Sequence, residues 1–302
     1  MSTVSDDESV DVDRGDIAEA VRVFEESRRR LFGIAYRMLG SVADAEDVLQ
    51  DVWIRWQGTD RSGIREPLAF LTTVTTRVSI NALQSAHTRR ETYIGPWLPE
   101  PVNTEDDPLL GAERGEALQF AILILLEKLT PNERAAYVLR EALDYEYDRI
   151  AEILQATPAS ARQLVSRARK HLASEKRVTA PEPDQRRLLE AFLAAAQRGE
   201  ASDLEALFAA DAGSWTDGNG VKLAARIPVL GASRVAKFVA AFSSHFWIGK
   251  EIGWTRVNDQ PAVTLSENGR VTTMLTLTAS ADGITRLLWV MSPDKLAHVE
   301  AA

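Results

Sequence analysis

The chain has 302 residues, which suggests two or three domains, and its hydrophobic share of 45% is ordinary for a globular protein. It contains no cysteine, which excludes disulfides and thiolate chemistry and removes the usual ligands of a structural zinc site. No stretch approaches the roughly 20 apolar residues that cross a bilayer, and the acidic start lacks the apolar core of a signal peptide, so we expect a cytoplasmic protein.

The net charge of -9 argues against a nucleic-acid partner only if the charge is spread evenly. Charges act over a screening length of about 8–10 Å in physiological salt, so local clusters decide which partners they attract. Basic residues gather in 61–90 and 162–177, whereas acidic residues gather in 1–16, near Asp44 and in 105–107. This segregation favours a protein that binds a polyanion and a second, basic partner, with chance segregation as the alternative.

Residues 1–16 are predicted to be a disordered acidic tail, because they hold almost no apolar residues. Residues 17–92 show helical periodicity, with Gly40-Ser41 ending one helix and Ser41 or Asp44 starting the next. In "DAEDVLQDVWIRW", residues 44–56, the predicted buried stripe is Ala45, Val48, Leu49, Val52, Trp53 and Trp56. The opposite face carries Asp44, Asp47, Gln50, Asp51 and Ile54. Taken alone, that face fits a solvated acidic surface better than a docking site for a basic helix.

Another helix is predicted over 67–91. It presents hydroxyl, amide and arginine side chains beside aromatic residues, a combination that suits single-stranded DNA. These side chains are Thr72, Thr73, Thr76, Arg77, Ser79 and Asn81, followed at the end by His87, Arg89 and Arg90.

A proline-rich linker is predicted over 93–112, and helices return over 113–178. Within 145–172, Asp148 can start one helix and Pro158 a second, with a tight turn between them. The second helix has one apolar face and a basic polar face that carries Arg162, Gln163, Ser166, Arg167, Arg169 and Lys170. This pattern predicts a DNA-binding helix-turn-helix, because arginine and glutamine read base edges and lysine and serine bind phosphates. An ordinary helical hairpin with a solvated basic face is the alternative.

A second linker is predicted over 179–184, and residues 185–302 read as one α+β domain. Two helices, 185–198 and 201–209, precede strand-like runs at 213–217, 252–257, 262–266, 271–279 and 285–290. Asn268-Gly269 and Asp282-Gly283 indicate hairpins, so we expect a curved antiparallel sheet.

The strings "YRMLGSVADAEDVLQDVWIRW" and "LTPNERAAYVLREALDYEYDRIAEIL" with "ARQLVSRARKHL" resemble regions 2 and 4 of bacterial extracytoplasmic-function sigma factors. The resemblance covers about residues 17–175. It implies that residues 44–56 dock on the β′ clamp helices of core RNA polymerase and that region 4 meets the β flap. It also implies that −10 DNA is bound by Arg61, Thr73, Thr76, Arg77, Asn81, Arg89 and Arg90. The −35 element would be bound by Ser160, Arg162, Gln163, Ser166, Arg167 and Lys170. Phe70 and Arg77 stand where many relatives carry a tryptophan and an asparagine, which leaves the −10 sequence open.

The last third is similar to the group of these sigma factors that bears a SnoaL-like C-terminal extension. "WLPEP" matches the group's linker motif, whereas "TDGNG" and "SPDKL" depart from its motifs at Asn219 and Ser292. The similarity implies regulation of the sigma domains in cis by Trp97, Leu98, Pro99, Glu100, Pro101, Asp217, Gly218, Gly220, Pro293, Asp294, Lys295 and Leu296. We expect the stiff linker to insert Trp97 and Leu98 into the C-terminal domain as a latch, the alternative being a segment packed on its own helices.

The expected fold is therefore two all-α sigma domains followed by an α+β, SnoaL-like (NTF2-like) cone. Asp217, Asp259 and His245 are candidate acid–base residues, but no dyad spacing appears among them, so we expect no enzyme, no cofactor and no metal. Trp215, Trp247, Trp254 and Trp289 could line an apolar cavity, and a small ligand in this cup is a further hypothesis. The expected protein is a monomeric initiation factor that binds core RNA polymerase and promoter DNA and is regulated by its own C-terminal domain. The alternative is a helix-turn-helix repressor or activator with a ligand-sensing domain.

Overall fold

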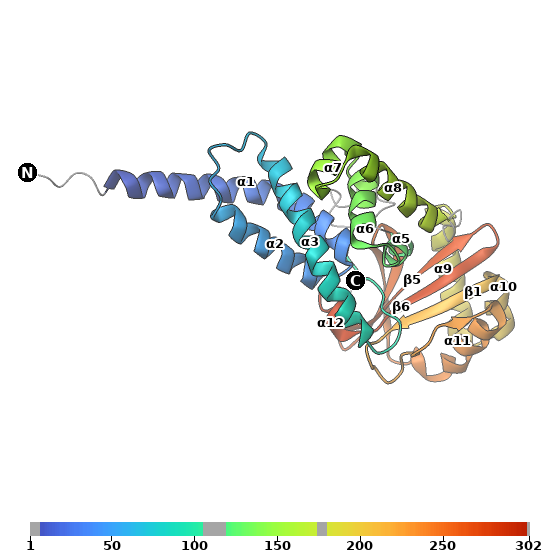
Figure 1. The fold of residues 1–302 in the computed structure, drawn as a ribbon. Coiled ribbons are helices and arrows are strands. Elements are labelled where there is room, and N and C mark those ends of the chain that lie inside the picture. The colour runs from blue at the N-terminus through green and yellow to red at the C-terminus, as the bar shows by residue number, and fades with distance from the viewer. Residues whose placement is uncertain (1–6, 105–118, 174–179, 301–302) are drawn as a thin grey trace, which may run out of the picture. The chain divides into compact units, whose positions relative to one another are not determined.

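The computed structural model describes residues 7–104, 119–173 and 180–300, without the side chains of 7–15, 87–89, 91 and 121. The chain divides into two compact units. The helical unit comprises Met1–Ala86 with Thr130–Ser166, and the sheet unit comprises His87–Leu129 with Arg167–Ala302. Figure 1 shows the elements of both units in the colours of the sequence.

The helical unit is built from α1 (Asp7–Leu39), α2 (Val42–Gln57), α3 (Pro67–Glu91), α6 (Pro131–Tyr137), a π-helical turn (Val138–Ala142), α7 (Tyr147–Leu154) and α8 (Pro158–Ala173). The last residues of α3 and α8 are counted with the sheet unit. The predicted start of α2 is confirmed, because the Ser41 hydroxyl caps the helix by accepting from the Asp44 amide at 3.2 Å. Thr130 and Glu133 form a capping box at the start of α6.

The prediction of a disordered tail over residues 1–16 is wrong from Asp7 onward, because α1 already begins there; residues 1–6 lie outside the described part. The low apolar content predicted disorder here, but two other effects favour a helix. Acidic residues near a helix N-terminus are favoured by the helix dipole, and extending an existing helix avoids the cost of nucleation.

The predicted helix-turn-helix is present as α7, a tight turn and α8. Gln155 ends α7 in the left-handed conformation with φ 53°. Ile150 and Ile153 of α7 pack with Ala161 and Val165 of α8 in one buried cluster. The short side chains in this cluster let the two helices approach closely.

The sheet unit contains α5 (Phe120–Leu126), α9 (Glu182–Arg198), α10 (Ala201–Leu207), α11 (Ala232–Phe246) and α12 (Pro293–Leu296). Its strands are β1 (Phe208–Asp217), β2 (Val229–Leu230), β3 (Glu251–Val257), β4 (Gln260–Glu267), β5 (Arg270–Ser280) and β6 (Gly283–Val290). They form one sheet in the order β2-β1-β6-β5-β4-β3. The expected antiparallel sheet is found except at its β1–β6 pair, which is parallel.

The two expected hairpins are present, β4–β5 around Asn268-Gly269 and β5–β6 with Ser280 opposite Gly283. A third hairpin, β3–β4, turns through Asn258 and Asp259, both with positive φ. The predicted linker over 179–184 is corrected at its end, because Glu182 already belongs to α9, where Pro181 and acidic first-turn residues favour a helix start. Residues 174–179 lie outside the described part. The helix α11 was not predicted.

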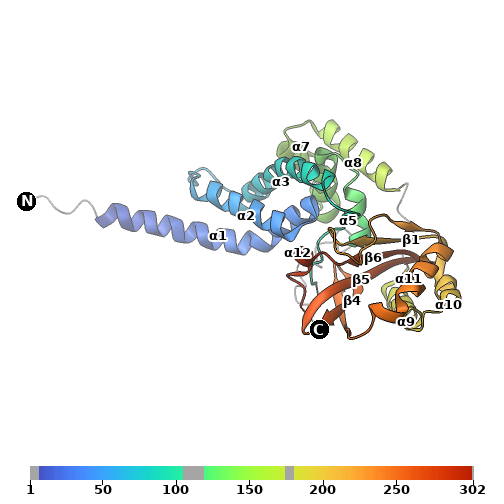
Figure 2. The ribbon, with the colours of Figure 1, turned by 90° about the horizontal axis from the view of Figure 1, so that it is seen from below.

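Each face of the sheet carries its own core. On one face, α9, α10 and α11 cover β4, β5 and β6, with Phe192, Val235 and Trp289 among the buried side chains. On the other face, Leu98 of the linker and Phe120 of α5 pack on the strands together with Leu296 of α12. Figure 2 shows α9–α11 on one side of the strands, and α5 and α12 on the other. The linker is thus part of the second core.

Candidate functional site

The basic face of α8 is open to solvent. All side chains predicted to bind −35 DNA are exposed: Ser160, Arg162, Gln163, Ser166, Arg167 and Lys170. The Arg162 guanidinium lies 5.2 Å from the centre of the Tyr147 ring. The opposite face of α8 is buried through Ala161, Val165 and Ala168. This geometry leaves hydrogen-bond donors directed outward along one helix face, as major-groove recognition requires.

The acidic face of α2 is also exposed. Ile54 leaves 58% of its surface accessible, Asp44 is partly exposed, and Asp47, Gln50 and Asp51 are exposed. The predicted stripe is buried except at Trp53, which is only partly covered. Ile54 thus presents an apolar contact on a face that also carries three carboxylates, the kind of surface that a basic partner helix would complement.

The residues predicted to bind −10 DNA are engaged within the helical unit itself. The Arg77 guanidinium donates to the Ile153 carbonyl at 2.8 Å and to the Glu152 carbonyl at 3.0 Å. The Arg149 guanidinium donates to the Ala69 carbonyl at 2.9 Å and to the Thr73 hydroxyl at 3.2 Å. These bonds join α3 to α7, so part of the predicted −10 face contacts the helix-turn-helix in this structure.

The remaining predicted −10 residues lie in different environments. Thr76 is fully buried, and its hydroxyl donates to the Thr72 carbonyl at 2.8 Å. Arg61 pairs with Asp16. Asn81 is exposed, whereas the side chain of Arg89 lies outside the described part. In this conformation, α3 does not present all of its predicted DNA contacts together.

In the sheet unit, the linker is anchored on a buried carboxylate. Asp217, at the end of β1, has no exposed surface. One of its oxygens accepts the Tyr93 hydroxyl at 2.5 Å, and the other accepts the Leu98 amide at 2.7 Å and the Lys295 ammonium at 2.6 Å. The Lys295 ammonium also donates to the Leu98 carbonyl. We call these four residues the linker anchor.

Burial controls the ionisation of the anchor. It raises the pKa of the Tyr93 hydroxyl far above its usual range, and the Asp217 carboxylate raises it further. Burial also lowers the pKa of Lys295 to about 8, against the opposing attraction of Asp217. The Lys295 ammonium lies 4.2 Å from the centre of the Trp97 ring and 5.0 Å from that of Tyr93. The aromatic faces thus contact a cation that is largely shielded from water.

The rest of the WLPEP segment is equally embedded. Pro99, Glu100 and Pro101 are buried, and Leu98 retains 1% of its surface. Beyond it, the linker continues along the sheet edge next to the β3–β4 turn. The Val102 amide donates to the Asn258 side chain at 3.0 Å, and the Asn258 amide donates back to the Val102 carbonyl at 2.9 Å.

Arg90, predicted to bind −10 DNA, contacts the linker instead. Its guanidinium lies 3.6 Å from the centre of the Trp97 ring and pairs with Glu127, which caps the end of α5. Trp97 is therefore held between Arg90 and Lys295. The predicted docking of Trp97 and Leu98 on the C-terminal fold is seen in the contact of Trp97 with Lys295 and in the burial of Leu98 on the sheet.

The TDGNG and SPDKL segments contribute to the linker site in different ways. A side chain on Gly218 would collide with Ala224, and a methyl group on Gly220 would lie 3.6 Å from Ile94 of the linker. Asn219 and Gly220 both have positive φ, the conformation of a tight turn. In α12, Lys295 and Leu296 are buried, whereas Pro293 and Asp294 are exposed and contribute no side chain to the anchor.

The candidate acid–base residues do not form a common site. Asp217 belongs to the anchor, Asp259 pairs with Arg256 in the β3–β4 turn, and His245 is exposed at the end of α11.

Of the four tryptophans expected in a cavity, Trp247 and Trp289 line one hollow. Trp215 and Trp254 instead stack against Arg286 and Arg186. Within the described residues, no helix combines the length and apolar character of a membrane-spanning segment.

The sequence did not reveal the roles of Tyr93 and Asn258 in holding the linker, or of Gln260 in holding α5. Gln260 accepts from the Phe120 amide at 3.1 Å and thereby holds the start of α5 on the sheet. Tyr93 could have been suspected, because a tyrosine four residues before Trp97 extends the apolar content of the linker. No local pattern marked Asn258 or Gln260.

Comparison with known proteins agrees with this organisation. The Sigma-70 region 2 model matches residues 23–89, and the Sigma-70, region 4 model matches residues 119–172. The ECF RNA polymerase sigma factor SigJ of Mycobacterium tuberculosis (strain ATCC 25618 / H37Rv) is 37% identical over 234 residues, which cover 76% of this chain and 75% of the relative. The probable ECF RNA polymerase sigma factor SigI of the same species (strain CDC 1551 / Oshkosh) is 30% identical over 279 residues, 91% of this chain and 93% of the relative.

A solved structure extends the match to the C-terminal fold. The crystal structure of Mycobacterium tuberculosis extracytoplasmic function sigma factor SigJ covers 92% of this chain and 98% of that chain, with a TM-score of 0.73 and 30% identity. It supports the SnoaL-like assignment of the α+β region. With regions 2 and 4 matched in order, the chain belongs to the extracytoplasmic-function RNA polymerase sigma factors, which bind core RNA polymerase and promoter DNA in transcription initiation.

Proposed function

We propose that the C-terminal fold inhibits this sigma factor in cis by holding the linker between regions 2 and 4. The observation that carries the proposal is the linker anchor, in which buried Asp217 accepts Leu98, Tyr93 and Lys295 together. Burying a carboxylate is costly unless it is paired, so an anchor with this many charge-assisted bonds has a strong preference for the docked linker.

A docked linker restricts the two DNA-binding regions that it connects. Regions 2 and 4 have to reach separate promoter elements, and the segment that joins them has to follow. Residues 93–104 cannot do so while Leu98 fills the core on the sheet and Val102 pairs with Asn258. Core RNA polymerase would therefore bind best to chains whose linker has been released, and binding would shift the population toward release.

The partner surfaces follow from the exposed faces. We propose that the acidic face of α2 docks on the β′ clamp helices, that region 4 meets the β flap, and that α8 reads the −35 element. The predicted −10 residues Thr73 and Arg77 are bonded to α7, so −10 binding would also require α3 and α7 to separate. Initiation thus depends on two openings, one in each unit.

Run-off transcription of fragmented genomic DNA by core RNA polymerase tests the proposal. The full chain would be compared with a chain that ends at Thr179 and therefore lacks the C-terminal fold. The proposal expects promoter-specific product from both, with more from the shorter chain. Less product from the shorter chain would show that the C-terminal fold assists initiation and would overturn inhibition in cis.

A further inference from the structure

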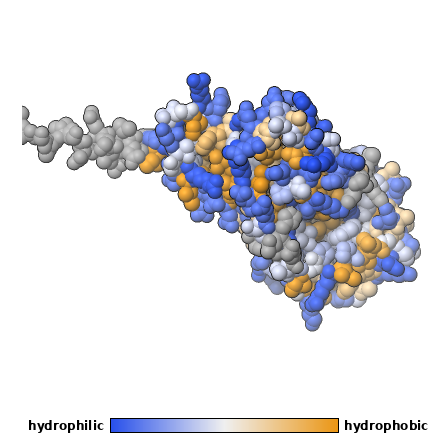
Figure 3. Space-filling model, viewed as in Figure 1, coloured by the Kyte–Doolittle hydropathy of each residue, from blue (hydrophilic) through white to orange (hydrophobic). Residues whose placement is uncertain are grey.

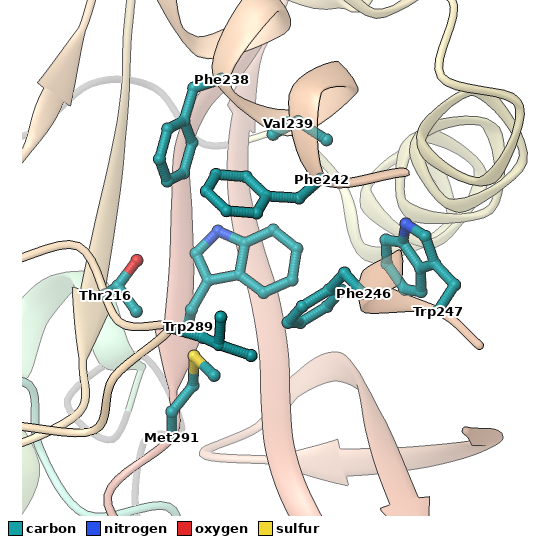
Figure 4. A pocket seen from close by; sticks show the side chains of 9 residues that line it. Thr216, Phe238, Val239, Phe242, Phe246, Trp247, Trp289 and Met291 are labelled. Carbon is teal, nitrogen blue, oxygen red and sulfur yellow. The ribbon is translucent and has the colours of Figure 1, made fainter. Parts of the chain in front are cut away.

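An aromatic hollow lies on the helix-covered face of the sheet, opposite the linker. It is lined by Phe238, Val239, Phe242 and Phe246 of α11, Trp289 of β6, and by Thr216, Leu223, Trp247 and Met291. Figure 4 shows the rings of Phe238, Phe242 and Phe246 gathered around Trp289. The enclosed part of the hollow measures about 40 Å³ and opens to solvent at its mouth, so a flat ligand would be seated in it only in part.

The rings meet edge to face around the hollow. The Phe246 and Trp289 centroids are 5.8 Å apart with an interplanar angle of 87°, and those of Phe246 and Trp247 are 5.1 Å apart at 89°. Phe238, Phe242, Phe246 and Trp247 are all partly exposed, and Leu223 leaves 50% of its surface accessible at the mouth. Aromatic surface left uncovered in a concave site is stabilised by an apolar ring that stacks against it.

One hydroxyl supplies polar specificity. No hydrogen bond of the Thr216 side chain is found among the described residues. Figure 4 shows its oxygen on the side of the aromatic rings. The Trp289 N–H, by contrast, already donates to the Ser214 hydroxyl at 3.1 Å. The chemistry fits a flat, apolar molecule with a single hydrogen-bonding group.

The hollow and the linker anchor lie on opposite faces of the sheet but are bounded by adjoining residues. Thr216 precedes Asp217 in β1, and the Met291 amide donates to the Asp217 carbonyl at 2.6 Å. Leu223 belongs to the loop 218–226, whose far side meets the linker. A methyl group on Gly95 would lie 3.5 Å from the Arg226 Cα. The same loop and strand ends therefore bound both sites.

We propose that the hollow binds a bicyclic aromatic compound with one hydrogen-bonding group, and that binding stabilises the docked linker. The second part rests on the regulation proposed above. The loop 218–226 bounds the hollow and contacts the docked linker, so release of the linker would change the surroundings of the hollow. A ligand that binds the docked form more tightly than the released form then favours docking. The ligand would act as a co-inhibitor of initiation.

Binding to the full chain is tested by ligand-observed NMR with two probes of one shape, indole and indene. Indole can donate its N–H to the Thr216 hydroxyl, and indene cannot. We expect saturable indole binding that Thr216→Val weakens by about 3- to 10-fold while leaving indene unaffected. Leu223→Ala should weaken both probes by at least about 3-fold, and Leu230→Ala, an exposed leucine outside the lining, should weaken neither.

Unsaturable binding, or equal affinities for the Leu223→Ala and Leu230→Ala variants, would overturn the site. Equal weakening of indole and indene by Thr216→Val would overturn the assigned ligand class. The coupling between the hollow and the linker is measured separately. If the ligand stabilises the docked linker, hydrogen exchange of the Leu98 amide should be slower at saturating indole. Normal binding with unchanged Leu98 exchange would overturn the coupling alone. A failure of the proposed inhibition in cis would be seen in a different experiment, the run-off transcription without ligand described above.

Discussion

Replacing Asp217 by asparagine should release the linker. The substitution keeps the size of the side chain but removes the charge that accepts Leu98, Tyr93 and Lys295. The amide oxygen can still accept, but the new NH₂ group replaces one of the two acceptors and faces either the Tyr93 hydroxyl or the donors of Leu98 and Lys295. Lys295, whose side chain is 9% exposed, loses its counterion.

The size of the effect follows from burial. Removing one partner of a buried ion pair costs about 3–5 kcal/mol. Lys295 could avoid the unpaired charge by releasing its proton. Deprotonating a lysine with the ordinary pKa of 10.5 near pH 7.5 costs about 4 kcal/mol, at 1.36 kcal/mol for each unit between the pH and the pKa. Both routes predict a roughly 100- to 4,000-fold larger population of chains with the linker released.

Hydrogen exchange of the full chain measures this population, because the Leu98 amide is bonded to Asp217 itself. Exchange over residues 93–104 should accelerate strongly in Asp217→Asn. It should stay unchanged in Asp282→Asn, which alters an exposed turn between β5 and β6. Exchange within β5 serves as the control for global unfolding. Equal protection of the linker in wild type and Asp217→Asn would refute the reasoning.

Leu98→Ala should reduce the free energy of unfolding of the sheet unit by about 2–5 kcal/mol, because Leu98 is buried. The control Ile94→Ala, at a half-exposed residue, should reduce it by less than about 0.5 kcal/mol. Calorimetry measures both values. Equal costs would mean that Leu98 adds little to the core. The pKa of Lys295 is lowered to about 8 by burial, so the folded chain binds fewer protons than the unfolded chain between pH 8 and 10.5. The stability of wild type relative to Lys295→Met should therefore rise with pH in this window, by on the order of 2 kcal/mol, and a flat difference contradicts the shift. Lys170→Ala should weaken promoter binding equally across −35 sequences and lower the salt slope by about 1, whereas Gln163→Ala should relax sequence preference; the reverse pattern would reassign the face of α8.

The sequence predicted those parts of the fold that depend on short-range chemistry. Ser41 capped its helix, Asn268-Gly269 formed its hairpin, and the alternation of apolar and basic residues over 158–172 predicted α8 correctly. In each case the residues that determine the structure lie within a few positions of one another.

The helix α11 was missed although Val235, Val239, Phe242 and Phe246 follow helical spacing. Its valines and phenylalanines also suit strands, and it lies between strand-like segments. The parallel β1–β6 pair was missed for another reason: it joins residues far apart in the chain, which local alternation cannot reveal.

The linker site was predicted only in part. Trp97 and Leu98 stood out because large apolar residues are unusual in a linker. That Asp217 and Lys295 would receive them came from resemblance to a family, since the pairs are separated by 119 and 197 residues. The contacts of Thr73 and Arg77 with α7 had no signal in the sequence, because the partners of Arg77 are backbone carbonyls. Any residue type has such a group.

The most direct test of inhibition in cis is run-off transcription by core RNA polymerase with three full-length chains: wild type, Asp217→Asn and Asp282→Asn. The same fold is present in all three, so only the anchor differs. The account predicts more promoter-specific product from Asp217→Asn than from the other two chains, which should match each other. Equal product from all three, with the linker shown by hydrogen exchange to be released in Asp217→Asn, would contradict it.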